Sequence, residues 1–222
     1  ELLGVNDFPT LKKYGLTCAV VSGVPGGIEN GLNRVENHDK IVEFMEKTLP
    51  AVAEFGAPNV ICFSGNRKGL SDEQGLEHCA IGLKRIAPVA EKHKVTVIME
   101  LLNSKVDHHD YMCDHTRWGV ELVKQVGAER FKLLYDIYHM QRMEGELAAT
   151  LQKHLARIGH VQLADNPGRH EPGTGEINYA FLFAHLDRIG YDGYIGCEYK
   201  PATTTEAGLG WRGASVESSV SW

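Results

Sequence analysis

Short apolar runs and amphipathic stretches alternate along the whole chain. Six runs, most of them rich in β-branched and aromatic residues, predict strands: Leu16–Val21, Asn59–Phe63, Val95–Met99, Phe131–Tyr135, His160–Leu163 and Tyr194–Cys197. Most of these runs are continuously apolar, which is typical of strands that are buried on both faces of a parallel sheet. The stretches between them carry apolar residues at a spacing near one helical turn.

End signals define five helices in these stretches: His38–Phe55, Asp72–Lys92, Thr116–Val126, Glu146–Ile158 and Asn178–Ile189. Ser71 and Asn178 are suited to cap helix N-termini. A glycine follows four of the predicted C-termini: Gly56, Gly127, Gly159 and Gly190. Pro50 lies inside the first helix and predicts a kink or a split near Thr48. The opening segment, up to Gly15, is expected to form the last turns of a further helix.

This alternation indicates βαβ units, since a strand and its helix together span roughly 25 to 45 residues. Neither the G-x-G-x-x-G nor the G-x-x-x-x-G-K-[ST] phosphate-binding motif is present. A TIM (β/α)8 barrel is therefore the predicted fold, within the α/β class. Only six strands are visible, so the first two βα units are missing from this chain or the barrel is incomplete. We expect a single barrel domain over residues 1–207 and a C-terminal tail over residues 208–222.

Composition narrows the classes of partner. The chain has 23 Lys and Arg against 29 Asp and Glu, without a basic run, which argues against nucleic acid as the main partner. No apolar stretch approaches the roughly 20 residues of a membrane span, and no signal-peptide pattern opens the sequence. The 5 cysteines are widely spaced, which indicates neither a disulfide framework nor a zinc ribbon and favours a reducing cytoplasm. Three of them, Cys18, Cys62 and Cys197, are expected to be buried.

Four strands carry a potential metal ligand at or near their C-terminal ends: Glu100, Asp136, Gln162 and Glu198. In a barrel these ends converge on one mouth, where three carboxylates and one amide oxygen would surround a divalent ion. Oxygen ligands favour Mg²⁺ or Mn²⁺, with Zn²⁺ or Co²⁺ as alternatives. A lone carboxylate after a strand is more often a helix cap or a solvated loop residue. Four ligands in successive strands are harder to explain by capping.

Four segments around these residues form recognisable motifs: Met99–Asn103, Tyr135–Gln141, His160–Asn178 and Gly196–Pro201. Together they resemble the hydroxypyruvate isomerase family, part of the wider group of TIM-barrel sugar isomerases and epimerases. The resemblance extends from about Leu16 to Pro201. The part from Gln162 to Asn178 is the most specific, because related ketose epimerases tend to carry His at the position of Gln162. The family's first two strands have no counterpart here, and Gly208–Trp222 matches no family motif.

The resemblance implies roles for individual residues. Glu100, Asp136, Gln162 and Glu198 would bind the divalent metal, and Glu100 and Glu198 would also be the acid/base pair. His139 and Arg169 would hold the substrate. The planar guanidinium of Arg169 suits a substrate carboxylate, although an arginine in a Gly- and Pro-rich loop is also a common surface residue. His139 has a structural alternative too, as a residue that only caps or packs.

The implied reaction interconverts hydroxypyruvate and tartronate semialdehyde through an enediolate. Removal of a proton beside a carbonyl needs a general base and stabilisation of the developing negative charge. A ketose 3-epimerase or a 2-oxo-tetronate isomerase would use nearly the same site, and a non-catalytic metal- or sugar-binding protein is an alternative of another class. A DNA-repair endonuclease would need more His and acidic ligands and a basic face. The expected partner is a small molecule, and a homo-oligomer is left open.

Overall fold

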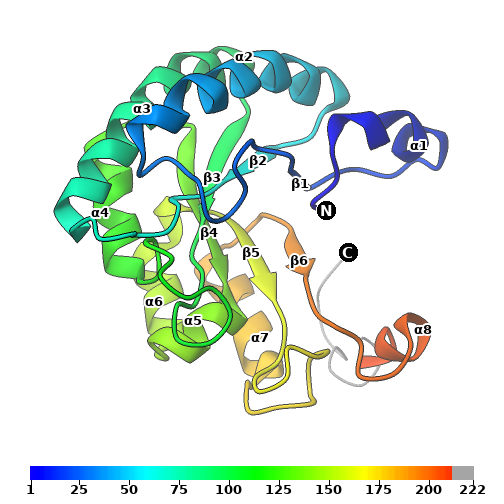
Figure 1. The fold of residues 1–222 in the computed structure, drawn as a ribbon. Helices are drawn as coiled ribbons and strands as arrows, with labels where there is room; N and C mark the ends of the chain where they lie inside the picture. Colours follow the sequence, from blue (N-terminus) through cyan, green and yellow to red (C-terminus); the bar gives the residue numbers. More distant parts are fainter. Residues whose placement is uncertain (212–222) are drawn as a thin grey trace.

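The computed structural model describes residues 1–211. Six parallel strands form one sheet in chain order: β1 (Val20–Val21), β2 (Asn59–Cys62), β3 (Thr96–Glu100), β4 (Phe131–Asp136), β5 (Ile158–Leu163) and β6 (Ile195–Cys197). Each strand overlaps one of the six predicted runs. Figure 1 shows the strands at the centre of the molecule with the larger helices around them. The predicted TIM-barrel architecture is confirmed as a curled, partial barrel.

Eight α-helices are present among the described residues: α1 (Phe8–Lys13), α2 (His38–Phe55), α3 (Asp72–His93), α4 (Thr116–Val126), α5 (Ile137–Met143), α6 (Leu147–His154), α7 (Tyr179–Ile189) and α8 (Thr205–Gly208). Short 3-10 turns occupy Val5–Asp7, Val35–Asn37 and Leu155–Arg157. The predicted caps are confirmed, because Ser71 accepts a hydrogen bond from the Gln74 N–H and Asn178 accepts one from the Phe181 N–H. Glycines in the left-handed conformation end α2, α4 and α7.

The structure contradicts two expectations about the helices, the split near Thr48 and the helix end at Ile158. The helix α2 is not split at Pro50 but continues to Phe55. The fully buried side chains Leu49 and Val52 flank the proline and anchor both halves against the core, which outweighs the missing hydrogen bond.

The predicted helix from Glu146 ends at His154, not at Ile158. Ile158 is instead the first residue of β5 and pairs with Leu133 of β4. Gly159 therefore does not end a helix. A side chain there would crowd Ile98 and Lys132, since a Cβ would lie 3.0 and 3.2 Å from their nearest atoms.

The first residues of the chain are extended and join the sheet. Leu2 donates to the carbonyl of Val20, and Leu3 forms a parallel bridge with Val21 of β1. The helix expected in this segment is present as α1, but these extended residues precede it. The Glu1 side chain, next to β1, contacts His160 of β5, so strands near the two opposite edges of the sheet approach each other here. The sheet therefore curls around its own interior.

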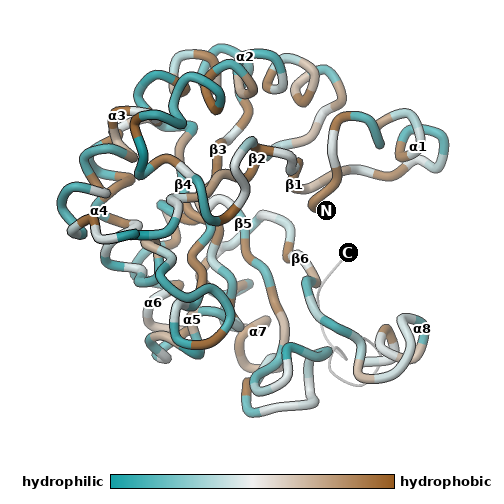
Figure 2. The backbone as a smooth tube through the Cα atoms, in the orientation of Figure 1, coloured by the Kyte–Doolittle hydropathy of each residue, from teal (hydrophilic) through white to brown (hydrophobic). Residues whose placement is uncertain are grey.

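That interior has an apolar floor. Val20, Ile61, Ile98 and Leu134, from β1 to β4, form a buried cluster separate from the larger core between sheet and helices. Figure 2 shows the strands mostly in hydrophobic colours, while the helices alternate between both. Alternate residues of a strand face the same side, so Glu100 and Asp136 face the interior above Ile98 and Leu134.

The end of the described chain packs on the barrel. Trp211 is buried and stacks on Phe183 of α7, with ring centroids 6.0 Å apart. The expected tail from Gly208 thus begins with packed residues, and its remainder, 212–222, lies outside the described residues.

Two of the three cysteines expected to be buried are so. Cys18 and Cys62 are buried, but Cys197 is exposed, because β6 is an edge strand of the sheet.

None of the helices in the described part of the chain is long and apolar enough to cross a membrane.

Candidate metal and substrate site

The two carboxylate oxygens of Asp136, at the end of β4, have different surroundings. One carboxylate oxygen, Oδ1, caps α5 by accepting from the backbone N–H groups of Tyr138 at 2.8 Å and His139 at 3.2 Å. The helix cap considered as an alternative for such residues is therefore real here. The other oxygen, Oδ2, is fully buried and has no hydrogen-bond partner among the described residues. Capping of α5 therefore explains the placement of Oδ1 but not the burial of Oδ2.

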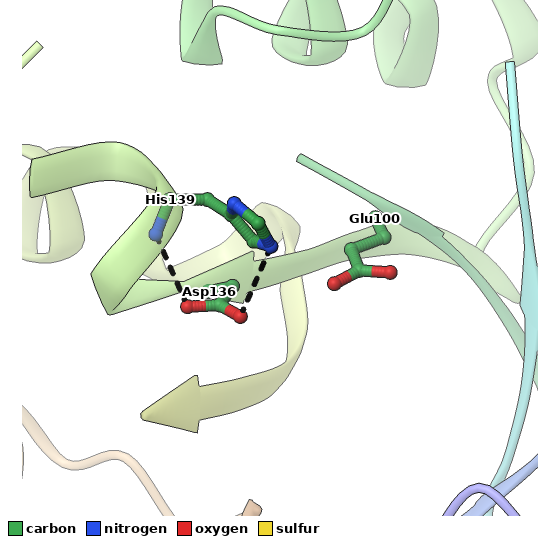
Figure 3. A group of neighbouring side chains, drawn as sticks. All are labelled: Glu100, Asp136 and His139. Atoms are coloured by element: carbon green, nitrogen blue, oxygen red, sulfur yellow. Dashed lines mark hydrogen bonds and ion pairs between the residues drawn. The ribbon is translucent and has the colours of Figure 1, made fainter. Parts of the chain in front are cut away.

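Two further buried atoms near Asp136 lack partners within the described residues: His139 Nε2 and Gln162 Oε1. Gln162 lies directly across from Asp136 in the β4–β5 register. Ligand atoms of Glu100, Asp136 and His139 all lie within 4.8 Å of one another, and Figure 3 shows the three side chains gathered at one point. A buried polar atom without a partner costs about 1–3 kcal/mol. Several such atoms around one point fit a site that holds a bound group.

Glu198 and Arg169 complete the cluster. Glu198 follows β6, and its backbone N–H donates to the Leu163 carbonyl of β5. An Nη2 atom of Arg169 lies 2.7 Å from Glu198 Oε2 and 3.9 Å from Asp136 Oδ2. The Arg169 guanidinium also lies over the Tyr138 ring, 5.2 Å from its centroid. Its side chain is only 17% exposed, so Arg169 lies in the mouth of the barrel and not on the open surface.

The local charge balance is negative. Burial, together with repulsion from Glu198 and Asp136, raises the pKa of Glu100 well above its usual value. Burial raises the pKa of Asp136 to about 7, although Arg169 opposes the shift. Burial also raises the pKa of Glu198. Three carboxylates thus face one guanidinium, and oxygen ligands with excess negative charge fit a divalent cation.

His139 is held as a neutral ring with a defined tautomer. Burial, and next the charge of Arg169, lowers its pKa to about 2. Its Nδ1 atom accepts a hydrogen bond from the backbone N–H of Asn103 at 3.2 Å. The single ring proton therefore lies on Nε2, the atom that faces Asp136. A protonated nitrogen cannot ligate a metal, so His139 is better suited to donate to a substrate oxygen.

The structure thus brings together all six residues selected from the sequence: Glu100, Asp136, His139, Gln162, Arg169 and Glu198. Sequence analysis missed Glu1, which contacts His160 and Gln162, and Asn103, which fixes the His139 tautomer. Asn103 ends the Met99–Asn103 motif, which was its one sequence signal. For Glu1 the only signal was an acidic residue beside the apolar pair Leu2 and Leu3.

Comparison with known proteins places this chain in a family. The sequence profile of the xylose isomerase-like TIM barrel matches residues 10–214. Hydroxypyruvate isomerase of Escherichia coli is 44% identical over 160 residues, which cover 70% of this chain and 60% of that protein. A 2-oxo-tetronate isomerase of Pectobacterium atrosepticum is 32% identical over 90% of this chain and 78% of that protein. These relatives confirm the resemblance found in the motifs.

Solved structures agree on the fold. A crystal structure described as AP endonuclease, family 2 from Brucella melitensis superposes with a TM-score of 0.85 at 31% identity, covering 95% of this chain and 83% of that one. The E. coli 3-keto-D-glucoside 4-epimerase superposes with a TM-score of 0.78 at 23% identity, covering 95% of this chain and 85% of that one, which supports the fold alone. The chain spans less than two thirds of the E. coli hydroxypyruvate isomerase that it matches.

Proposed function

Since this chain belongs to the xylose isomerase-like TIM barrel family, we propose that it acts as a metal-dependent isomerase of a small hydroxy-oxo acid. The preferred pair is hydroxypyruvate and tartronate semialdehyde. The observation that carries the proposal is a set of buried polar atoms that have no partner within residues 1–211 and that lie between three carboxylates, within reach of one arginine. A small-molecule substrate without a nucleic-acid partner, and a cytoplasmic location, are parts of the same proposal.

Glu100, Asp136, Gln162 and Glu198 are the proposed metal ligands. Asp136 Oδ2 and Gln162 Oε1 are buried oxygens without a hydrogen-bond partner in the described part of the chain, so both are free to ligate a cation. An all-oxygen set favours Mg²⁺ or Mn²⁺, with Zn²⁺ or Co²⁺ as alternatives. When bound, such an ion stabilises the negative charge that develops on the substrate oxygens.

Glu100 and Glu198 are the proposed acid/base pair. Glu100 ends β3 and Glu198 follows β6, and these two strands are separated in the sheet by β4 and β5. A small substrate in the barrel mouth therefore has a carboxylate on each side. One carboxylate removes the proton beside the carbonyl, and a carboxylic acid returns a proton to the neighbouring carbon.

His139 and Arg169 position the substrate in this proposal. The Nε2–H group of His139 points into the site and donates to a substrate oxygen. Arg169 carries several N–H donors, and one of them, on Nη2, donates to Glu198 Oε2 at 2.7 Å. A substrate carboxylate would pair with the same planar group through two oxygens. The site therefore favours acids over neutral sugars.

A 2-oxo-tetronate isomerase is the second candidate. The relative of that name in P. atrosepticum matches this chain over a larger share of its length than the E. coli hydroxypyruvate isomerase does. Nucleic-acid chemistry fits less well. The charge balance is −6, and the described residues contain one group of three or more His, Cys, Asp and Glu ligands.

Substrate profiling tests the proposal directly. Metal-free protein would be incubated with hydroxypyruvate, 2-oxo-tetronate and C5 or C6 ketoses, each with Mn²⁺ or with a chelator, and the products identified by NMR. We expect metal-dependent isomerisation of one of the acids and slow or no turnover of the ketoses. Conversion of ketoses alone would assign the site to an epimerase. Tight metal binding without any turnover would instead indicate a binding protein.

A further inference from the structure

Gln162 can serve as a metal ligand in only one orientation of its amide. The oxygen ligates a cation, whereas the NH₂ group does not. In the structure, Gln162 Nε2 donates to Glu1 Oε1 at 3.2 Å, and Gln162 Oε1 is turned away from Glu1. A carboxylate only accepts hydrogen bonds, so Glu1 can pair with the NH₂ side alone. The contact with Glu1 therefore selects the orientation in which the oxygen is left for the site.

Glu1 is itself held by two other parts of the barrel. Its Oε2 atom lies 2.8 Å from His160 Nε2, and the His160 side chain is fully buried. His160 precedes Gln162 by two positions in β5, so both side chains face the interior. Gly196 of β6 lies directly across from Gln162, and a Cβ at this position would collide with the Glu1 carboxylate. The glycine leaves the space that the carboxylate fills.

We propose that Glu1, held by His160 and by the space over Gly196, is a positioning residue that directs the Gln162 amide oxygen toward the metal site. The inference rests on the proposed metal function and assigns Glu1 no contact with substrate. Its side chain is 14% exposed, and both of its oxygens have defined partners. Partners of this kind behind a metal ligand typically contribute 10- to 100-fold to metal affinity.

A purely structural role is the competing explanation, since the same contacts also join the start of the chain to β5. Reversal of the hydrogen bond separates the two roles. Gln162→Glu alone would place two carboxylates against each other. The double variant Glu1→Gln/Gln162→Glu restores the hydrogen bond in the reverse direction, with position 1 as the donor and position 162 as the acceptor. In it, the new amide at position 1 still accepts from His160 and donates to the carboxylate at position 162.

The experiment measures Mn²⁺ affinity of the metal-free full chain by electron paramagnetic resonance, with circular dichroism as the folding control. We expect Glu1→Ala to weaken Mn²⁺ binding by about 10- to 100-fold without loss of fold. Gln162→Glu should also weaken binding, and the double variant should recover it to within a few-fold of wild type. Glu77→Ala, at an exposed position of α3, is the matched control and should bind as wild type does.

Wild-type affinity in folded Glu1→Ala would refute the inference and leave the proposed function intact. If Glu1→Ala does not fold, the double variant decides, and binding no better than in Gln162→Glu alone would overturn the positioning role. Absence of Mn²⁺ binding in the wild type is distinguishable from both outcomes, because it would remove the proposed metal site and this inference with it.

Discussion

The two oxygens of Asp136 have different surroundings, and this difference allows the site to be tested apart from the fold. Oδ1 caps α5, while Oδ2 is buried without a partner in the described chain. Burial raises the pKa of this carboxyl group to about 7, so the ionised form destabilises the metal-free folded state at higher pH. The buried charge of Asp136 therefore costs stability, which is the trade-off expected of a residue with the proposed role in metal binding.

Asp136→Asn should separate these effects. The amide keeps an oxygen for the α5 cap but removes the buried charge. We expect Mn²⁺ affinity to fall by at least tenfold, while the metal-free variant is more stable than wild type by about 1–3 kcal/mol at pH 8. Binding titrations and urea unfolding measure the two quantities. A variant that is strongly destabilised without metal would show that Asp136 is mainly structural.

Arg169 offers a test of substrate class. Arg169→Ala removes the guanidinium that faces Glu198 and Asp136. We expect kcat/KM for acidic substrates to fall by about 10- to 150-fold, because a charge-assisted pair contributes roughly 1.5–3 kcal/mol. Any residual turnover of neutral ketoses should change much less. Arg169→Lys is the control that keeps the charge and loses the planar fork. Equal losses for acidic and neutral compounds would exclude Arg169 from carboxylate recognition.

At the scale of elements, an ion pair joins two loops beside the mouth of the barrel. Arg67, after β2, lies 3.0 Å from Asp114, after β3. Burial alone would raise the pKa of Asp114, but hydrogen bonds from Arg67, Ser104 and His115 outweigh it and lower that pKa. An acid with a lowered pKa stabilises the fold above its unfolded pKa, and this contribution is lost as the pH falls through the folded pKa.

Asp114→Asn should therefore destabilise the protein in a pH-dependent way. We expect a loss of about 1–3 kcal/mol at pH 7, between the values for exposed and buried ion pairs. The difference from wild type should shrink as the pH falls below about 4, the ordinary pKa of an aspartate, because the unfolded chain then binds a proton that the folded Asp114 does not. Urea unfolding of the wild type and of Asp114→Asn at pH 7 and pH 3 measures this difference in the free energy of unfolding. Glu43→Gln, which removes the exposed ion pair with Lys47, should not change the free energy of unfolding measurably. A pH-independent loss in Asp114→Asn would contradict the charge argument.

Sequence predicted elements well where the signal is local. The ends of α2, α4 and α7 follow from the glycines after them, which adopt the left-handed conformation. The predicted split at Pro50 and the predicted helix end before Gly159 failed because packing between distant segments decides both positions.

The same distinction holds in the site. Carboxylates at strand ends were visible as a pattern, because parallel strands bring their C-terminal ends together. The orientation of His139 was not visible, since it depends on the backbone of Asn103, 36 positions away. The contact between Glu1 and Gln162 joins residues 161 positions apart, and only the curled sheet brings them together.

At the scale of the whole molecule, metal binding should stabilise the fold. The proposed ligands come from β3, β4, β5 and the residue after β6, so one ion would link most of the sheet. A ligand that binds only the folded state at 100 times its Kd contributes about 2.7 kcal/mol. For a protein of this size that corresponds to a rise in Tm of about 5–10 °C.

Calorimetry with and without Mn²⁺ measures this effect. The wild type should show the rise, a chelator should reverse it, and Asp136→Asn should not show it. Equal stabilisation of the wild type and Asp136→Asn would place the bound ion elsewhere in the molecule.

Proton transfer between adjacent carbons by residues of the barrel mouth is the central claim, and isomerisation in D₂O tests it most directly. Wild-type protein with Mn²⁺ should place solvent deuterium on the carbon that accepts the returning proton, as the carboxylic acid exchanges with solvent. Glu198→Gln keeps a ligating oxygen but cannot take a proton. The Glu198→Gln variant should retain part of the bound metal, while its isomerisation rate falls by about 10²- to 10⁴-fold. A product free of deuterium would indicate a hydride shift, and near-normal turnover by Glu198→Gln would contradict the account.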